Sequence, residues 1–508
     1  MTTEKLDGLR NDMKTVTQNI ISLINQRMEI AKKIGEIKSE LQLRVVDDKA
    51  EQEIKNYILH NSNNKDLDPE FLGRIINMLI KESVSIQNNE KNKMKLLPNN
   101  NNSNNNYNSN NKIIPVMPRV ADNTANYENA VSNIKIKTHM DVFNKAKQLD
   151  SLGKKIIHME VGEPDFLPPP QVKVELMSIY DKHRYHYTET AGIFDLRNKL
   201  SVYLTQLSES KANKINPNNI VATVGGRFAI FCTFCSVLRP GDEVIIIEPA
   251  WPAYKDCAKY LGVKTKVIET SLEQKWEPDI SAIEDSINAN TKIICLNYPN
   301  NPTGKILDET KLQSIVQIAE RNNLYILSDE VYCNFAFKKF SSILNTPSEN
   351  SIMIGSFSKT YSMTGFRVGF AYSENKNLID KLIKIQSLTL TSVSEPMQLC
   401  ALAALSHNPS EYSQTMKKRI EFVCSRLKKM PFEFFYPDGA MYVYAKINEE
   451  LAIDDLTLIE KLLQKGVAVA PGSGFGDNYK KYIRISTCID EDRLGTGLNI
   501  ISQTVNSL

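Results

Sequence analysis

Residues 356–370 read SFSKTYSMTGFRVGF and place one lysine, Lys359, among small hydroxyl and apolar residues. Lysine is ordinarily a solvated surface residue. The segment that leads into this stretch, residues 351–356, is short and apolar, without alternation. Three further segments have the same character: residues 243–247, 292–297 and 324–328. Such runs indicate strands that are buried on both faces, as in a parallel sheet covered by helices. The sequence therefore predicts an α/β domain in which Lys359 lies just beyond a strand.

Unusual residues follow each of these four predicted strands. In chain order the loops hold Trp251 and Tyr254, Asn301 and Gly304, Asp329 and Tyr332, and Lys359 and Arg367. Ligands of such sheets bind beyond the carboxyl ends of the strands. A lysine that is held out of bulk water loses its proton, becomes nucleophilic and condenses with carbonyl groups. We therefore expect Lys359 to bind the aldehyde of a ring cofactor as an imine.

A ring cofactor held in this way needs partners for its face, ring nitrogen, phenolic oxygen and phosphate. Trp251 offers a flat face, and Asp329 offers a carboxylate that keeps the ring nitrogen protonated. Asn301 and Tyr332 offer donors to the phenolic oxygen. The predicted phosphate cradle combines backbone N–H groups, hydroxyls and a cation: Gly225, Gly226, Ser356, Ser358 and Arg367. The alternative for Trp251 is core packing, and we expect Tyr254 to be a packing residue.

Seven motifs in this part of the chain resemble fold-type I pyridoxal-phosphate-dependent aminotransferases of the aspartate/aromatic group. They include VGEPDF, VGGRFA, NNPTG, SDEVY and SFSKTYSMTGFRVG, in the order and spacing of that family. The similarity extends over nearly all of residues 117–508. It implies pyridoxal 5'-phosphate as the cofactor. It also implies a large domain with a mostly parallel sheet and a smaller α+β domain.

The resemblance assigns roles to particular residues. It implies that Lys359 carries the cofactor and later moves the substrate proton, while Asp329 stabilises the protonated ring. Arg484, in the motif KYIRIS, would clamp the substrate α-carboxylate in bidentate fashion, with help from Gly162 and Asn301.

Two further residues are implied at the phosphate site. Tyr187 would reach the phosphate bound by the neighbouring subunit of a homodimer. Arg227 would contribute its backbone, and we expect its side chain to do no more than face solvent.

The 508-residue chain is too long for one ordinary domain, and it divides visibly. Residues 97–114 are an asparagine-rich tract that cannot bury enough apolar surface to fold, which predicts a disordered linker. The expected domains are therefore residues 1–96, an all-helical domain, and residues 115–508, the aminotransferase-like domain.

Helical periodicity dominates the first domain. Apolar residues at three- and four-residue steps predict one amphipathic helix over residues 3–39, followed by helices over 47–60 and 70–88. A helix of about 37 residues is roughly 55 Å long. It cannot bury its apolar stripe against two shorter helices of its own chain, so we expect an intertwined homodimer.

The motifs NQRMEIAKKIGEIK and ESVSIQ, with LR near the start, resemble the all-helical chorismate mutases over residues 4–90. This rearrangement needs no proton transfer, only a folded dicarboxylate and stabilisation of charge on the ether oxygen. The resemblance implies catalytic roles for Arg27, Lys38, Glu51 and Gln87. The full implied substrate site is Arg10 of the partner chain, Arg27, Lys38, Asp47, Glu51, Ser83 and Gln87. The family usually has Arg-Glu where this chain has Ala50 and Glu51.

The sequence thus predicts a bifunctional enzyme of aromatic amino acid biosynthesis. Its substrates would be chorismate, prephenate or an aromatic 2-oxo acid, and glutamate or aspartate as amino donor. The alternative is an aspartate/aromatic aminotransferase whose helical domain is inactive because of Ala50 and serves as a dimerisation or effector-binding module. A lyase or synthase on the same cofactor fold also shares Lys359, Asp329 and Arg484. A DNA-binding regulator is disfavoured, since no helix-turn-helix pattern or basic recognition face is seen.

Composition narrows the location and the partners. A net charge of +3 gives no reason to expect nucleic acid or membrane binding, and the N-terminus has no signal-peptide pattern. Eight scattered cysteines indicate a reducing compartment, so we expect the cytoplasm. Cys232 and Cys235 read as small hydrophobic residues in a buried helix, and His183 and His186 lack further ligands, so no metal site is expected.

Overall fold

The computed structural model describes residues 2–40, 75–76, 78–80, 83–84, 136, 138–209, 214–346 and 348–508. The chain divides into two compact units, Met1–Pro118 and Arg119–Leu508. The predicted domain boundaries at residues 96 and 114 lie outside the described residues, so they stay predictions.

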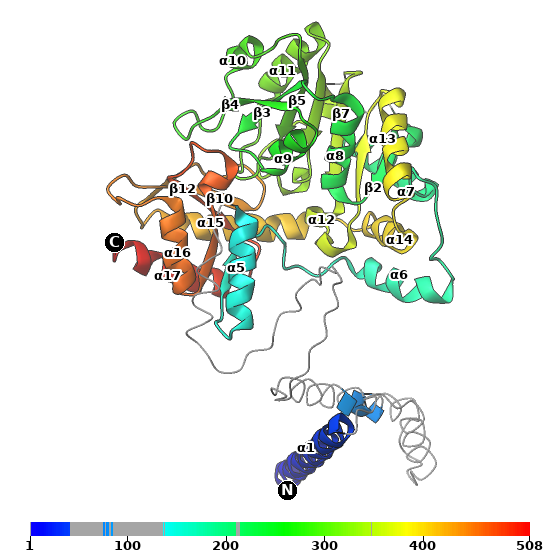
Figure 1. The fold of residues 1–508 in the computed structure, drawn as a ribbon, viewed down its shortest axis with the longest axis vertical. Helices are drawn as coiled ribbons and strands as arrows, with labels where there is room; N and C mark the ends of the chain where they lie inside the picture. The colour runs from blue at the N-terminus through cyan, green and yellow to red at the C-terminus, as the bar shows by residue number, and fades with distance from the viewer. Residues whose placement is uncertain are drawn as a thin grey trace, which may run out of the picture. The chain divides into compact units, whose positions relative to one another are not determined.

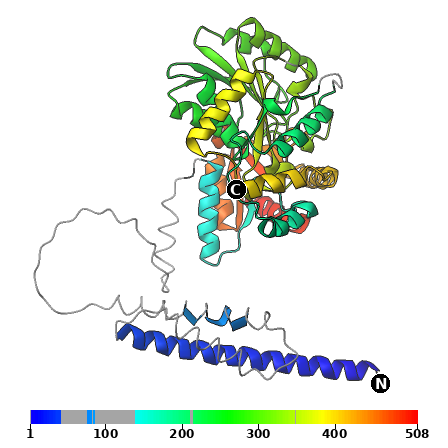
Figure 2. The same ribbon diagram turned by 90° about the vertical axis from the view of Figure 1, so that its right-hand side faces the viewer.

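The described part of the first unit is dominated by one helix, α1 (Thr2–Glu40), which Figure 2 shows as a single unbroken helix. This confirms the helix predicted over residues 3–39. Large apolar side chains remain exposed along α1: Met13, Val16, Ile20, Ile21, Leu23, Ile30, Ile34 and Ile37. Residues 75–76, 78–80 and 83–84 are helical, within the predicted third helix, and the predicted helix over 47–60 lies outside the described residues.

The second unit contains a seven-stranded sheet, whose central strands end at the candidate site. Its order is β2 (Ile220–Thr223), β8 (Gly369–Tyr372), β7 (Ser351–Ser356), β6 (Tyr325–Asp329), β5 (Thr291–Asn297), β3 (Glu243–Glu248) and β4 (Lys264–Glu269). β4, β3, β5, β6 and β7 run parallel, and β8 is antiparallel to both of its neighbours. The four strands predicted from apolar runs are β3, β5, β6 and β7, and the mostly parallel sheet is confirmed.

Helices cover both faces of this sheet, as its two-sided apolar strands require. One face packs on α8 (Gly225–Val237), α9 (Ala253–Tyr260) and α13 (Lys376–Thr389), which lie side by side in Figure 1. The other packs on α6 (Pro170–Asp181), α7 (Phe194–Leu207), α10 (Ile280–Asp285), α11 (Glu309–Arg321) and α14 (Glu395–Ala404). On β3, Val244 and Ile246 belong to the first core and Ile245 and Ile247 to the second.

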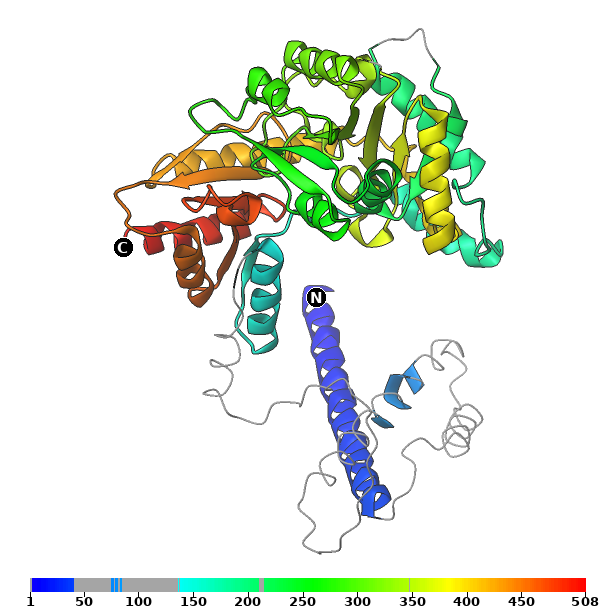
Figure 3. The same cartoon turned by 45° about the horizontal axis from the view of Figure 1, so that its top comes forward.

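The smaller domain is built around a five-stranded sheet. Its order is β1 (Ile157–Met159), β11 (Val467–Pro471), β12 (Tyr482–Ser486), β10 (Tyr442–Ile447) and β9 (Phe432–Phe434). Four helices share its core: α5 (His139–Ser151), α15 (Ser410–Leu427), α16 (Asp455–Gln464) and α17 (Glu491–Val505). Figure 3 shows α5 beside the C-terminal strands, although the two lie far apart in sequence. The predicted smaller α+β domain is therefore present.

Short helices occupy several of the remaining loops. They are α12 (Phe357–Thr360) and the 3₁₀ turns η1 (Pro217–Asn219), η2 (Cys333–Phe335), η3 (Ile343–Asn345), η4 (Thr364–Phe366) and η5 (Gly472–Phe475). None of the helices in the described ranges is long and apolar enough to cross a membrane. All eight cysteines are free, and Cys232 and Cys235 lie on α8 as predicted.

Candidate active site

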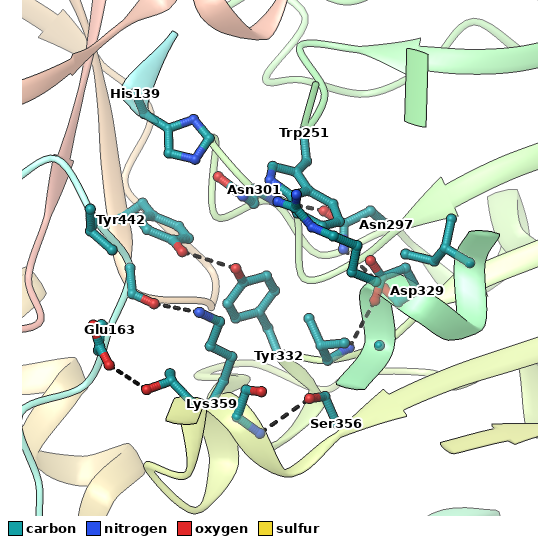
Figure 4. A pocket seen from close by; sticks show the side chains of 18 of the residues that line it. His139, Glu163, Trp251, Asn297, Asn301, Asp329, Tyr332, Ser356, Lys359 and Tyr442 are labelled. Atoms are coloured by element: carbon teal, nitrogen blue, oxygen red, sulfur yellow. Dashed lines mark hydrogen bonds between the residues drawn. The ribbon is translucent and has the colours of Figure 1, made fainter. Parts of the chain in front are cut away.

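A cavity of about 510 Å³ lies beyond the carboxyl ends of β5, β6 and β7 (Figure 4). It brings together Trp251, Asn301, Asp329, Lys359 and Arg484, which the sequence had singled out from separate motifs. Asn297 and Asp329 close neighbouring parallel strands and pair in register. The parallel sheet therefore delivers these loops to one edge, as its topology predicts.

Lys359 lies on α12, directly after β7, and its amine points into the cavity. Its Nζ donates a hydrogen bond to the carbonyl oxygen of Gly162 at 2.5 Å. Burial lowers the pKa of Lys359, and the positive charges of Arg484 and Arg367 act in the same direction. Since the unprotonated amine is the nucleophile, this environment suits condensation with an aldehyde.

Asp329 presents a buried carboxylate at the end of β6. The hydroxyl of Tyr254 donates to its Oδ2 at 2.6 Å, and the amide of Asn297 donates to its backbone carbonyl at 2.9 Å. Burial raises the pKa of Asp329 to about 6, although the hydrogen bond from Tyr254 opposes this rise. A cation beside Asp329 would offset the burial of its charge, which is the role expected of a protonated ring nitrogen. Tyr254 is buried as expected, but it is also a hydrogen-bond donor to this carboxylate.

Arg484 on β12 is only 2% exposed, yet among the described residues no carboxylate pairs with it. Its Nη1 donates to Asn301 Oδ1 at 2.9 Å, and its Nη2 donates to the carbonyl oxygen of Glu160. The guanidinium carbon lies 4.3 Å from the ring centre of Tyr442 and 4.9 Å from that of Phe475. A buried charge without a counter-charge is costly, so the arrangement favours an anionic ligand in the cavity.

Aromatic side chains form two sides of the cavity. The hydroxyls of Tyr332 and Tyr442 are hydrogen-bonded at 2.9 Å, and both are buried. Trp251 is half-buried and lines the cavity, with the Arg227 guanidinium 4.6 Å from its ring centre. Arg227 is exposed as expected, but its side chain lies over this ring and lines the cavity.

The predicted phosphate cradle assembles where α8 begins. Gly225 has φ of +75°, and a Cβ there would lie 2.6 Å from Nη2 of Arg367. Gly226, Ser356, Ser358 and Arg367 all line the cavity. The backbone N–H of Ser358 donates to Ser356 Oγ at 3.1 Å, and Arg367 Nη1 donates to the Thr364 carbonyl at 2.9 Å. Helix N–H groups, hydroxyls and a guanidinium thus meet without a side chain at Gly225, which fits a phosphate group.

Two cavity residues, Tyr442 and His139, carried no signal in the sequence, whereas Glu163 belongs to the motif VGEPDF. Tyr442 and His139 come from the smaller domain, and Glu163 accepts a hydrogen bond from the Thr364 hydroxyl. Burial lowers the pKa of His139 to about 3, and the charges of Arg484, Arg227 and Lys359 contribute. His139 is therefore neutral at physiological pH, and among the described residues its Nδ1 has no hydrogen-bond partner.

One predicted residue does not lie in the cavity. Tyr187 is 90% exposed and is absent from its lining. The prediction that Tyr187 serves the neighbouring subunit stays a prediction.

The candidate mutase residues are described only in part. Arg27 and Lys38 are half-buried on α1, and among the described residues Arg27 Nε has no acceptor. Ser83 is buried, and its hydroxyl donates to the carbonyl of Leu79 at 2.8 Å. The side chain of Arg10 and all of Asp47, Glu51 and Gln87, together with Ala50, lie outside the described residues.

Comparison with known proteins separates the chain into the same two parts. Residues 154–501 match the family Aminotransferase class I and II, and residues 9–88 match Chorismate mutase type II. The chain is 35% identical to an aspartate aminotransferase of Thermotoga maritima, over 74% of this chain and 98% of the relative. It is 29% identical to a probable aspartate/prephenate aminotransferase of Aquifex aeolicus, over 74% of this chain and 98% of that one.

Solved structures agree with this assignment. The Thermotoga maritima aspartate aminotransferase superposes with a TM-score of 0.69 at 35% identity, covering 74% of this chain and 99% of that one. An aspartate aminotransferase of Thermus thermophilus crystallised with maleate superposes with a TM-score of 0.68 at 28% identity, over 76% of this chain and 100% of that one. The chain therefore belongs to the class I and II aminotransferases, and a chorismate mutase type II domain is fused before its aminotransferase domain.

Proposed function

We propose that this chain is a bifunctional enzyme of aromatic amino acid biosynthesis. Its N-terminal domain would convert chorismate to prephenate. Its C-terminal domain would transaminate prephenate, or an aromatic 2-oxo acid, with glutamate or aspartate as donor. The observation that carries the transaminase half is the cavity that joins Lys359, Asp329 and the buried Arg484, which has no carboxylate partner among the residues that the structure describes. The fusion carries the pathway half, because prephenate is itself a 2-oxo acid.

The residues of the cavity fit pyridoxal 5'-phosphate, on which class I and II aminotransferases generally depend. Lys359 would bind the aldehyde, Asp329 would hold the ring nitrogen, and Trp251 would cover the ring. The cradle of Gly225, Gly226, Arg227 backbone, Ser356, Ser358 and Arg367 would hold the phosphate. When bound, the ring withdraws electrons and stabilises negative charge at the substrate Cα.

The protein side chains would then do three tasks. The Arg484 guanidinium, fixed by Asn301 and two aromatic rings, binds and orients the substrate α-carboxylate. The Lys359 amine, which lies at the Gly162 carbonyl, would take the proton from the substrate Cα. Tyr332 and Asn301 would hold the phenolic oxygen of the ring, and the hydrogen bond from Tyr442 would fix the Tyr332 hydroxyl.

A further cation in the cavity, Arg227, has no assigned role beside Lys359, Arg367 and Arg484, and it favours substrates that carry two carboxylates. Arg227 lies over Trp251 and faces the cavity, whereas His139 nearby is neutral and contributes no charge. Prephenate, glutamate and aspartate each have a second carboxylate, and phenylpyruvate does not. The name of the Aquifex aeolicus relative, aspartate/prephenate aminotransferase, points in the same direction.

The remaining proposals concern the N-terminal domain and the assembly. Arg27, Lys38 and Ser83, with Arg10 of the partner chain, Asp47, Glu51 and Gln87, would form the mutase site. The exposed apolar side chains of α1 support an intertwined homodimer, and the exposed Tyr187 supports a second contact between subunits. Eight free cysteines support a reducing compartment such as the cytoplasm.

A panel of oxo acids tests the transaminase half. With glutamate as donor, we expect kcat/KM for prephenate to exceed that for phenylpyruvate, because only prephenate engages Arg227. Failure to transaminate any oxo acid in the presence of pyridoxal 5'-phosphate would overturn the proposal.

Chorismate given alone tests the mutase half. Formation of prephenate is expected. Saturable binding of chorismate or phenylalanine without turnover would instead support the alternative, in which Ala50 leaves a dimerisation or effector-binding module.

A further inference from the structure

Three titratable side chains form a continuous hydrogen-bonded chain beside the cavity. Asp150 lies at the end of α5, His158 on β1, and Glu160 directly after β1. His158 Nε2 lies 2.7 Å from Asp150 Oδ2, and His158 Nδ1 lies 2.7 Å from Glu160 Oε1. Ionised carboxylates only accept hydrogen bonds, so both ring nitrogens must donate. The geometry therefore calls for a protonated, positively charged imidazole.

Of the two carboxylates that contact His158, that of Glu160 depends more on the positive charge of the imidazole. It is 0% exposed, and among the described residues neither Lys nor Arg forms an ion pair with its carboxylate. Its Oε2 has no hydrogen-bond partner among those residues either. A buried carboxylate with a single cationic partner loses its compensation when that partner becomes neutral. Asp150, by contrast, is half-exposed and can be solvated by water.

The same segment contacts two of the cationic side chains that line the cavity, Arg484 and Lys359. The backbone carbonyl of Glu160 accepts from Arg484 Nη2, and that of Gly162 accepts from Lys359 Nζ. Glu163 accepts a hydrogen bond from the Thr364 hydroxyl. The position of the Glu160 backbone therefore helps to set the position of the Arg484 guanidinium.

The charges around His158 come from two elements. β1 with its extension supplies Glu160, and α5 supplies Asp150, with Lys147 acting on Asp150. β11 pairs with β1 through Ala468, and α17 also packs on β1. Among the described residues, β11 and α17 place no charge within ion-pair distance of His158. The hydrogen bond to Glu160 raises the pKa of His158, and Asp150 contributes.

We propose that His158 is a positioning residue for substrate binding: its imidazolium holds the buried Glu160 carboxylate and so keeps the Glu160 carbonyl on Arg484. When His158 loses its proton, the buried Glu160 carboxylate loses its cationic partner, and the Glu160 carbonyl no longer holds the Arg484 guanidinium in place. Binding of the substrate carboxylate then weakens, whereas the proton transfer at Lys359 is not directly affected. This inference rests on the proposed role of Arg484.

The first test is His158→Asn, which keeps a donor toward Glu160 but removes the charge. We expect KM for glutamate, and Kd for the unreactive dicarboxylate succinate, to rise about tenfold, the effect of one hydrogen bond to a charged group. The change in kcat should be much smaller. Asp150→Asn should give a smaller rise, because Asp150 is half-exposed. The exposed Lys154→Gln, which also removes one positive charge, is the matched control.

A double-mutant cycle separates positioning from general damage. Glu160→Gln removes the charge that His158 compensates, so adding His158→Asn to it should cause little further rise in KM. Additive effects in the double variant would overturn the proposal. So would a His158→Asn enzyme whose KM and Kd lie within about twofold of the wild type.

The pH dependence of succinate binding provides a test that does not need the His158→Asn protein to fold. A raised pKa means that the compensating charge is present at low pH and is lost as pH rises through that pKa. The Kd of the wild type for succinate should therefore increase as pH rises through the pKa of His158. The Glu160→Gln protein should show no such increase. An identical increase in both proteins would refute the role of Glu160. If the wild-type holoenzyme neither transaminates nor binds succinate, the proposed function fails instead.

Discussion

Replacing Tyr254 with phenylalanine should weaken cofactor binding through Asp329, without disturbing the core. The substitution removes only the hydroxyl, which donates to Asp329 Oδ2 at 2.6 Å. The ring stays, and with it the edge-on contact to Trp251 at 5.6 Å. The other hydrogen bond to this carboxylate, from the backbone N–H of Val331, is long at 3.4 Å. The buried charge would therefore lose its main hydrogen-bond donor.

The magnitude follows from the strength of that hydrogen bond. A hydrogen bond to a charged group contributes about 1.5–3 kcal/mol, so the Kd for pyridoxal 5'-phosphate should rise roughly tenfold to hundredfold. Burial already raises the pKa of Asp329 to about 6, and Tyr254 opposes this, so its loss raises that pKa further. In the wild type, the ionised carboxylate that binds a ring cation is present above about pH 6 and is lost as pH falls. In Tyr254→Phe that loss should begin about one to two pH units higher.

The assay is absorbance titration of cofactor-free protein with pyridoxal 5'-phosphate between pH 5.5 and 9, roughly two units to either side of neutrality. Only the difference between the two proteins is interpreted, because the cofactor itself titrates in this range. Adding Tyr254→Phe to Asp329→Asn should cause no further change, since the acceptor carboxylate is already gone. A Tyr254→Phe protein with the same Kd and the same pH dependence as the wild type would refute this reasoning.

Three other substitutions test the two-site assignment. Lys359→Ala should abolish transamination and the visible absorbance of the imine between the lysine and the cofactor while sparing chorismate turnover, and loss of both activities would show that the sites are not independent. Arg27→Ala should abolish prephenate formation from chorismate and leave transamination unchanged, with both activities measured in the same preparation. Arg484→Lys should raise KM for glutamate about tenfold or more, because one ammonium cannot replace the fork that contacts Asn301 and the substrate. An unchanged KM would place the substrate carboxylate elsewhere.

Local pattern was enough to find the parts of the active site. The apolar runs before Asn301, Asp329 and Lys359 are the parallel strands β5, β6 and β7. Because parallel strands present their carboxyl ends at one edge, the order of motifs already implied that these residues would meet. The same holds for α1, whose length follows from the helical periodicity of residues 3–39.

The roles of other residues could not be predicted from sequence motifs or periodicity. Tyr254 was expected to be a packing residue, and it is buried as expected. Its hydroxyl, however, donates a hydrogen bond to Asp329, which is 75 positions away in the sequence. His139 stands outside every recognised motif and reaches the cavity only because α5 packs on the smaller sheet. Arg227 was expected to turn only to solvent, whereas its guanidinium lies over Trp251.

The sequence by itself determined the class of chemistry: a lysine, a carboxylate and an arginine at the ends of buried strands, with a long helix in a separate domain. Only the tertiary structure decided which charges are compensated. Within the part of the chain that the structure describes, Arg484 has no carboxylate partner, and Glu160 has His158 as its cation. The reason is physical: periodicity records which face of an element is buried, whereas the energy of a buried charge depends on neighbours that the chain brings from elsewhere.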